Sequence, residues 1–222
     1  MTTDLDRQRL ATLDKRVLRG GSAFEAEVAV YSGAEGGFVV KDCSPMHPLM
    51  RALFGRRVKN REIAIYARLE GAAGVPDFVG VIDGDAFAIE YVEGQTLARH
   101  LDRPLLDGAL ANLATVVDGL HARRVVHLDL KQKRNVLVRP DGSVAIIDFE
   151  SALHLGEGIL GRALFAFLKK RDRAGVVKFK SKYAPHLLDA GEEKSARRER
   201  VLGALWPFKR LGRLFRGLFG RK

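Results

Sequence analysis

Apolar and polar residues alternate along two short stretches near the start of the chain, Glu25–Gly33 and Gly37–Asp42. An alternation with a period of two puts every second side chain on one face, which is typical of half-buried strands. The segment between them, Ser32–Gly37, is rich in glycine and serine and favours a turn. The pattern therefore predicts a strand hairpin.

Helical periodicity replaces the alternation after this hairpin. Residues His47–Gly71 have a proline near their start, apolar residues at helical spacing and a glycine that suits a helix end. Between residues 74 and 94, two further short strands flank the turn Asp83–Asp85. A second amphipathic helix is then predicted by apolar residues that recur at steps of three and four: Leu106, Leu110, Leu113, Val117 and Leu120.

Short apolar runs separated by polar loops follow this helix. The expected elements are a strand at Val125–Val126, a polar loop at His127–Arg134, a strand at Asn135–Val138 and a strand at Val144–Ile147. A β-rich part followed by a mainly helical part predicts an α+β fold with two lobes and a cleft between them. We expect the lobes to comprise residues 1–94 and 95–190, with a basic tail at 191–222.

Composition is consistent with a globular protein of this size. The chain has 222 residues, of which 46% are hydrophobic and 29% charged, so it suits one domain or one small core shared by two lobes. The single cysteine, Cys43, excludes an internal disulfide and fits a reducing compartment. The polar N-terminus does not resemble a signal peptide, and no apolar run approaches the roughly 20 residues of a membrane-spanning helix.

The net charge of +11 is concentrated late in the chain, where Glu192–Lys222 contains ten Lys or Arg residues and three Glu. The segment after Pro207 has an apolar helical face made by Phe208, Leu211, Leu214, Phe215, Leu218 and Phe219. Cations around this face suit an anionic membrane surface, which residues 201–222 would contact without spanning. Alternatively, this helix packs its apolar face on the protein. We expect no nucleic-acid partner, because the apolar residues form a stripe and not interleaved stacking platforms.

Five residues at the ends of apolar runs have the chemistry that phosphoryl transfer from ATP requires. Such a site must position the acceptor and neutralise charge around Mg²⁺. Lys41 ends a predicted strand and would bind the nucleotide phosphates. Glu62 lies in the predicted helix and would hold that lysine. Individually, a strand lysine and a helix glutamate are usually surface residues, so the argument depends on the combination.

The other three residues lie in the second half. Asp129, in the loop after a strand, would accept the proton of the attacking hydroxyl. Asn135 would help to hold the metal, and Asp148 would bridge metal and phosphates. Asp148 follows four apolar residues, so its carboxylate should lie at the end of a buried strand, where it is costly unless it meets a cation.

Over residues 15–155 the chain resembles the protein-kinase-like superfamily. "HLDL", "NVLV" and "IDF" resemble its catalytic and metal-binding loops, and "FVVK", "REIAIYARL" and "FAIEYVEGQTL" resemble its upstream motifs. The resemblance implies ATP and Mg²⁺ as cofactors and an adenine-binding hinge with the backbone of Glu90 and Val92. It also implies that Lys131 contacts the transferred phosphate and that His127 braces the catalytic loop.

Within that superfamily the chain looks most like the bacterial lipopolysaccharide kinases, and it is also similar to RIO-type kinases. The layout of Phe54–Val81 and the shortness of the chain prompt this comparison. It implies transfer to a sugar hydroxyl, Kdo or heptose, of a lipid A–core glycolipid. The enzyme would then be cytoplasmic and peripheral on the inner face of the cytoplasmic membrane.

The chain departs from the family pattern at the metal-binding and phosphate-binding positions. Asn135 lies one residue further from Asp129 than the family spacing, and Arg134 occupies the usual place. Either the loop bulges and Asn135 still reaches the metal, which we favour, or a second metal is held weakly. The phosphate loop is reduced to Gly20, Gly21 and Ser22. Their N–H groups could bind phosphates, or the three residues could form a plain turn between strands.

Three further departures concern the acceptor. Leu128 replaces the arginine that binds a phosphorylated activation loop in many protein kinases. Glu150 replaces a glycine, and no A-P-E sequence follows. All three favour a non-protein acceptor. We therefore expect a sugar kinase, with a RIO-like serine/threonine protein kinase as the alternative. A non-catalytic, membrane-binding module of the same fold is the third hypothesis, supported by the shifted Asn135 and the reduced glycine loop.

Overall fold

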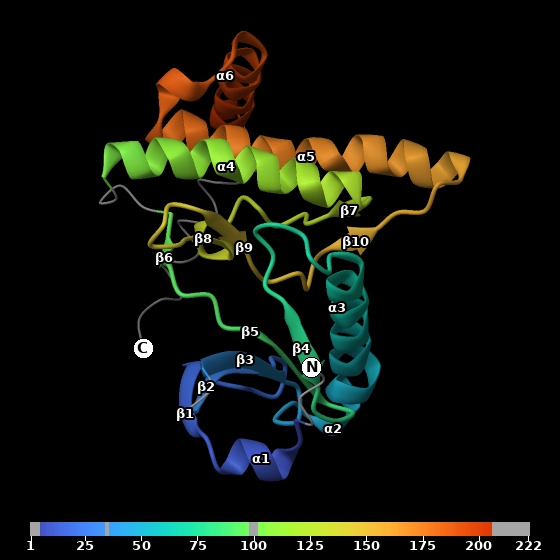
Figure 1. Ribbon diagram of the computed structural model, residues 1–222. Coiled ribbons are helices and arrows are strands. Elements are labelled where there is room, and N and C mark those ends of the chain that lie inside the picture. The colour runs from blue at the N-terminus through green and yellow to red at the C-terminus, as the bar shows by residue number, and fades with distance from the viewer. Residues whose placement is uncertain (1–4, 34–35, 98–101, 206–222) are drawn as a thin grey trace, which may run out of the picture.

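The structure is a computed structural model that describes residues 5–33, 36–97 and 102–205, with the backbone alone for 198–205. The amphipathic helix expected after Pro207 lies outside the described residues. The chain is an α+β protein with a β-rich N-terminal part and a helical C-terminal part, as the sequence predicts (Figure 1).

The N-terminal part is built on a five-stranded antiparallel sheet with the strand order β1-β2-β3-β5-β4. Its strands are β1 (Asp14–Arg19), β2 (Glu27–Gly33), β3 (Gly36–Asp42), β4 (Phe78–Val81) and β5 (Ala86–Glu90). The helices are α1 (Arg7–Ala11), α2 (Pro48–Met50), the π-helical η1 (Arg51–Gly55) and α3 (Arg56–Arg68). The predicted hairpin is confirmed, because β2 and β3 pair from Glu27 with Asp42 to Gly33 with Gly36.

The C-terminal part consists mainly of helices, with two small sheets on the side that faces the N-terminal part (Figure 1). Its long helices are α4 (Arg103–Ala122), α5 (Ile159–Tyr183) and α6 (Ala190–Leu205), and the 3₁₀ turn η3 (Pro185–Leu187) lies between α5 and α6. The short strands are β6 (Gln95–Thr96), β7 (Val125–Val126), β8 (Val136–Val138), β9 (Val144–Ile146) and β10 (Leu153–His154), and η2 (Lys133–Asn135) is a 3₁₀ turn.

One hydrophobic core runs through both parts and fixes the floor of the cleft. It joins Tyr66 of α3 and Phe87 of β5 to Leu110 of α4 and to Phe149, all of which are buried. Gly74 adds a backbone connection, since its carbonyl accepts a hydrogen bond from the N–H of Ile146 at 2.8 Å. This close approach requires glycine, because its φ is +74° and a Cβ there would lie 2.7 Å from the Val144 carbonyl oxygen.

Several elements differ from the sequence prediction. The predicted helix His47–Gly71 is divided among α2, η1 and α3 and ends at Arg68, and the strand expected from Asn135 begins at Val136. The edge strand β1 was not predicted, because its first five residues are exposed and show no alternation of apolar and polar positions. The helix α5 was also missed. Its exposed and buried apolar residues lie on different sides, so no single stripe marks it in the sequence.

Candidate active site

A buried ion pair joins β3 to α3 at the floor of the cleft. The Nζ of Lys41 lies 2.6 Å from Oε1 of Glu62, and the two residues are only 8% and 1% exposed. Burial lowers the pKa of Lys41, but the carboxylates of Glu62 and Asp148 more than offset this effect, so the net shift is upward. Burial raises the pKa of Glu62, and the ammonium group opposes that rise. With two carboxylates at contact distance, we take Lys41 as charged and the pair as ionic.

Asp148 lies just beyond β9 and faces the same lysine. Its Oδ1 is 3.0 Å from the Nζ of Lys41, so one ammonium group contacts carboxylates from both parts of the protein. Burial raises the pKa of Asp148 and Lys41 lowers it more strongly, so the net pKa lies below the ordinary value. Its φ of +69° is in the left-handed region, which aspartate adopts more readily than most residues.

The next residue, Phe149, anchors this turn in the core. Its ring is fully buried and lies 5.3 Å from the ring of Tyr66 and 4.9 Å from the ring of His127. Its backbone N–H donates to Oε1 of Glu62 at 3.2 Å. Glu62 therefore contacts both Lys41 and the loop that carries Asp148.

His127 holds the loop that contains Asp129. The ring is buried, and burial lowers its pKa, so the imidazole is neutral at pH 7. Its Nε2 lies 3.1 Å from the carbonyl oxygen of Ile147, which can only accept, so Nε2 carries the proton. Nδ1 is then free to accept from the N–H of Asp129 at 3.3 Å. These contacts agree with the expected bracing role.

Asp172 of α5 is a site residue that the sequence reasoning missed. It is fully buried, and its two carboxylate oxygens accept from the N–H of His127 at 2.8 Å and of Leu128 at 2.7 Å. His121 approaches the same carboxylate at 3.1 Å. Leu128 has a φ of +67°, an unfavourable conformation for a leucine, so an anchor of this strength is needed to hold it. Asp172 lies 43 residues after Asp129 in the sequence, and no local pattern marked it.

The turn η2 absorbs the extra residue before Asn135. Asn135 is the last residue of this turn, is 1% exposed and donates from Nδ2 to the carbonyl oxygen of Asp129 at 3.1 Å and to its Oδ2 at 3.0 Å. The N–H of Ile147 in turn donates to the carbonyl of Asn135 at 3.0 Å. The asparagine therefore contacts Asp129 despite its shifted spacing, and Arg134 is exposed.

A cavity of about 250 Å³ brings these groups together. Its lining combines polar and apolar side chains. The polar ones are Arg19, Lys41, Glu90, Tyr91, Arg134, Asn135 and Asp148, and the apolar ones are Leu18, Val28, Val39, Ile89, Val92, Leu137 and Ile147. An apolar slot next to a few convergent polar groups is the usual form of a nucleotide site.

The predicted hinge residues Glu90 and Val92 also line this cavity. The N–H of Glu90 already donates to the carbonyl of Asp77 at 2.8 Å, and the contact of Glu90 and Val92 with adenine stays a prediction. Lys131 lies half-buried two residues after Asp129, and its carbonyl oxygen accepts from the Nζ of Lys178 at 2.6 Å. Its contact with a phosphate stays a prediction.

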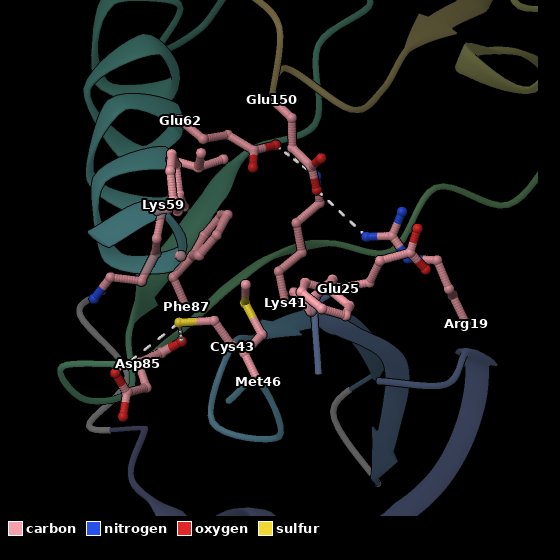
Figure 2. Close-up of a pocket in the computed structure, with 15 residues that line it drawn as sticks. Arg19, Glu25, Lys41, Cys43, Met46, Lys59, Glu62, Asp85, Phe87 and Glu150 are labelled. Carbon is pink, nitrogen blue, oxygen red and sulfur yellow. Dashed lines mark hydrogen bonds and ion pairs between the residues drawn. The ribbon is translucent and has the colours of Figure 1, made fainter. Parts of the chain in front are cut away.

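The reduced phosphate loop connects β1 to β2. Gly20 and Gly21 are exposed, and Ser22 forms a tight turn in which its Oγ accepts from the N–H of Glu25 at 3.1 Å. The residues on either side of this turn, Arg19 and Phe24–Ala26, line a second cavity of about 310 Å³ together with Lys41 and Glu62 among others (Figure 2). Gly20, Gly21 and Ser22 do not line it, and their phosphate-binding role remains a prediction.

Arg19 and Glu150 form a bridge across this second cavity. Nη2 of Arg19 lies 3.4 Å from Oε1 of Glu150, and the same oxygen lies 3.8 Å from the Nζ of Lys41 (Figure 2). The backbone carbonyl of Glu150 also accepts a hydrogen bond from Arg61 of α3. The glutamate that replaces a glycine after "IDF" therefore ties the metal loop to β1 and α3.

The donor set fits Mg²⁺. Within the described residues no group of three or more His, Cys, Asp or Glu side chains is placed to hold a metal. Magnesium, however, usually takes one or two carboxylates and completes its shell with water and substrate phosphates. Asp148 and Asn135 line one cavity and offer a carboxylate and a carboxamide oxygen, which agrees with that requirement.

Comparisons with known proteins give two partial matches. A probable SapB synthase of Streptomyces coelicolor is 33% identical over 141 residues, which cover 53% of this chain and 15% of that protein. The serine/threonine-protein kinase PknA of a Nostoc species is 32% identical over 123 residues, which cover 50% of this chain and 22% of that protein. No family model matches the chain.

The chain thus spans less than a quarter of the length of either relative. These distant matches hint at kinase-like relatives and support a kinase-like activity in general terms, without indicating an acceptor. Together with the two-part α+β fold, they indicate that about half of this chain is similar to a serine/threonine kinase.

Proposed function

We propose that this protein is an ATP-dependent phosphotransferase that phosphorylates a hydroxyl group. The observation that supports this most is the convergence of Lys41, Asn135 and Asp148 on one cavity, with Asp129 accepting a hydrogen bond from Asn135. These residues come from three separate segments of the chain, since Asp129 and Asn135 lie in the same loop. Burial and two carboxylate partners shift the pKa of this lysine, and groups perturbed in this way cluster at functional sites.

Each residue has a distinct task in this proposal. Lys41, oriented by Glu62, binds phosphate oxygens of the nucleotide at the end of the apolar slot. Asp129 accepts the hydrogen of the acceptor hydroxyl and orients its oxygen for in-line attack. Asp148 and Asn135 would hold Mg²⁺, which when bound neutralises charge on the phosphates. His127 and Asp172 keep the Asp129 loop in place, so transfer does not depend on a loop that must first become ordered.

We further propose that the acceptor is a sugar hydroxyl of a lipopolysaccharide core, Kdo or heptose, met at the cytoplasmic face of the membrane. Leu128 and Glu150 depart from the protein-kinase pattern in the direction of small-molecule kinases. The structure adds that α5 begins at Ile159, so only residues 149–158 separate Asp148 from the next long helix. So short a segment leaves little chain to form a platform for an extended peptide.

A serine/threonine protein kinase is the second candidate. It is favoured by the similarity to PknA, which is a serine/threonine-protein kinase. The two candidates share the nucleotide site and differ only in the acceptor, so they predict the same effect of mutations at Lys41 or Asp148. Only an assay of the acceptor can separate them.

The test is incubation with radiolabelled ATP and Mg²⁺, separately with lipid A–core glycolipid and with a mixture of proteins. We expect label in the glycolipid, and label in the protein mixture alone would favour the second candidate. Asp129→Asn should abolish transfer while nucleotide binding, measured by calorimetry, stays nearly unchanged. The control Asp141→Asn alters an exposed turn and should leave transfer intact. Normal turnover in Asp129→Asn would contradict the mechanism. If the wild-type protein turns over no ATP with any acceptor, a non-catalytic module is favoured.

A further inference from the structure

The first half of α5 exposes an apolar stripe that no catalytic role explains. Ile159 and Leu160 are 92% and 83% exposed, and Phe167 is 69% exposed. Ile159, Ala163 and Phe167 follow one another at intervals of four residues, with Leu160 and Leu164 beside them, so these exposed side chains lie on one side of the helix. Soluble proteins seldom display contiguous apolar residues of this kind without a binding partner.

The second half of the same helix packs against the protein. Asp172, Val176 and Phe179 are buried and face the catalytic loop and the core. In the first half, Phe165 points the same way, since its ring lies 4.7 Å from the guanidinium carbon of Arg124. The exposed stripe therefore lies on the side of α5 that is turned away from the protein.

Within the described residues, the neighbouring helices leave this stripe uncovered. The N-terminal end of α5 extends past the end of α4, and α6 lies over the opposite end of α5 (Figure 1). That contact includes an ion pair between Lys180 and Glu192, with 3.0 Å between Nζ and Oε1.

The charge on α5 identifies the kind of partner. The helix contains eight Lys or Arg residues and one acidic residue, Asp172, whose carboxylate is occupied inside the protein. Arg162, Lys170 and Arg171 flank or continue the apolar stripe and are exposed. In the described part of the chain, no carboxylate forms an ion pair with any of these three. The surface thus combines exposed aliphatic side chains with unneutralised cations.

We propose that this face of α5 binds an anionic lipid surface, with Leu160 and Phe167 entering the headgroup boundary and the adjacent cations contacting lipid phosphates. An interfacial helix has this combination of an apolar stripe and Lys or Arg side chains. The surface is separate from the C-terminal tail and would bind even if the tail packed elsewhere. It would also hold the cleft close to the membrane, whichever acceptor the enzyme uses.

Other occupants of the stripe are disfavoured by charge. Residues 206–222 at the end of the tail include six Lys or Arg residues and no acidic residue. A second copy of the chain would present the same basic helix. Like charges brought together oppose both contacts. Nucleic acid would meet the cations but would leave exposed aliphatic side chains without a suitable partner.

The first experiment compares the binding of full-length chains to phosphatidylcholine vesicles with and without phosphatidylglycerol. In the variant Leu160→Gln/Phe167→Gln the net charge is unchanged and both positions are exposed, so the fold should be retained. We expect binding to anionic vesicles to weaken about 30-fold, because two side chains no longer enter the apolar layer. The matched control is Leu49→Gln/Phe54→Gln, which removes the same exposed residue types from the N-terminal part and should bind like the wild type.

A second measurement distinguishes α5 from the tail. Leu160→Cys in a Cys43→Ala background, labelled with the environment-sensitive dye NBD, should shift its emission to the blue when anionic vesicles are added. If the vesicles bind the protein and the emission does not shift, the tail alone makes the contact and the proposal is wrong. If the emission of the labelled protein without vesicles is already blue-shifted relative to the dye in water, the chain itself covers the stripe. Dimerisation that Leu160→Gln/Phe167→Gln abolishes would identify a second copy as the occupant. Either result would overturn the proposal.

Discussion

Replacement of Asp172 tests whether a single buried carboxylate holds the catalytic loop. Asp172→Ala leaves the N–H groups of His127 and Leu128 without acceptors in a fully buried site. Each unpaired backbone group costs about 1–3 kcal/mol, so we expect a loss of about 4 kcal/mol in the free energy of unfolding. Asp172→Asn keeps one acceptor oxygen and should lose about half as much. Leu128, no longer held at a positive φ, should relax towards a more favourable conformation.

The free energy of unfolding is measured by urea denaturation followed by circular dichroism, and the transfer rate is measured on the same samples. Phosphoryl transfer should fall more than nucleotide affinity, because Lys41 and the apolar slot do not depend on this loop. The control Asp118→Asn breaks an exposed ion pair with Arg173, at 3.2 Å, and should change stability by less than about 1 kcal/mol. If Asp172→Ala and Asp118→Asn unfold at the same urea concentration, the carboxylate does not anchor the loop and the reasoning is refuted.

Two further predictions concern buried titratable groups. Lys41→Met should lower the free energy of unfolding by about 3–5 kcal/mol, because it leaves Glu62 buried without its cation. In urea denaturation, the double variant Lys41→Met/Glu62→Gln should recover most of this loss. It should not recover nucleotide binding. The other prediction uses pH: burial lowers the pKa of His127 in the folded protein, so as pH falls below about 6.5 the unfolded chain takes up the proton first. Stability should therefore decrease between pH 7 and pH 5, by at most about 1.4 kcal/mol per pH unit from this group. His127→Asn should reduce the decrease in stability between pH 7 and pH 5, whereas His47→Asn, at an exposed position, should not. An equal decrease in both variants would show that His127 does not cause this pH dependence.

Much of the site could be predicted because its residues stand next to strong local patterns. Lys41 ends an alternating strand and Asp148 follows four apolar residues, so both had to lie at the edges of buried strands. Glu62 was assigned opposite Lys41 because phosphoryl transfer needs a helix glutamate that holds the phosphate-binding lysine. Asn135 was harder, since its spacing from Asp129 was unusual, and the 3₁₀ turn that compensates for the extra residue leaves no signal in the hydrophobic pattern.

The residues that sequence reasoning missed act through long-range contacts. Asp172 stands on a helix among basic residues and looks like part of a solvated surface, yet its carboxylate is buried against the backbone of His127 and Leu128. Arg19 ends an exposed edge strand, and its ion pair with Glu150 joins residues 131 positions apart. Neither contact can be read from a window of neighbouring residues, because each depends on how separate elements pack.

The sequence by itself determined the hairpin of β2 and β3, the amphipathic helix α4 and the division into a β-rich and a helical part. These features follow from local periodicity, since a buried face must repeat with the period of its strand or helix. Only the tertiary structure decided which charges meet, that Asn135 turns towards Asp129, and that one half of α5 is buried while the other is exposed. Burial and pairing depend on distances between segments far apart in the chain, and the free energy of a charge depends on those distances and on the surrounding solvent.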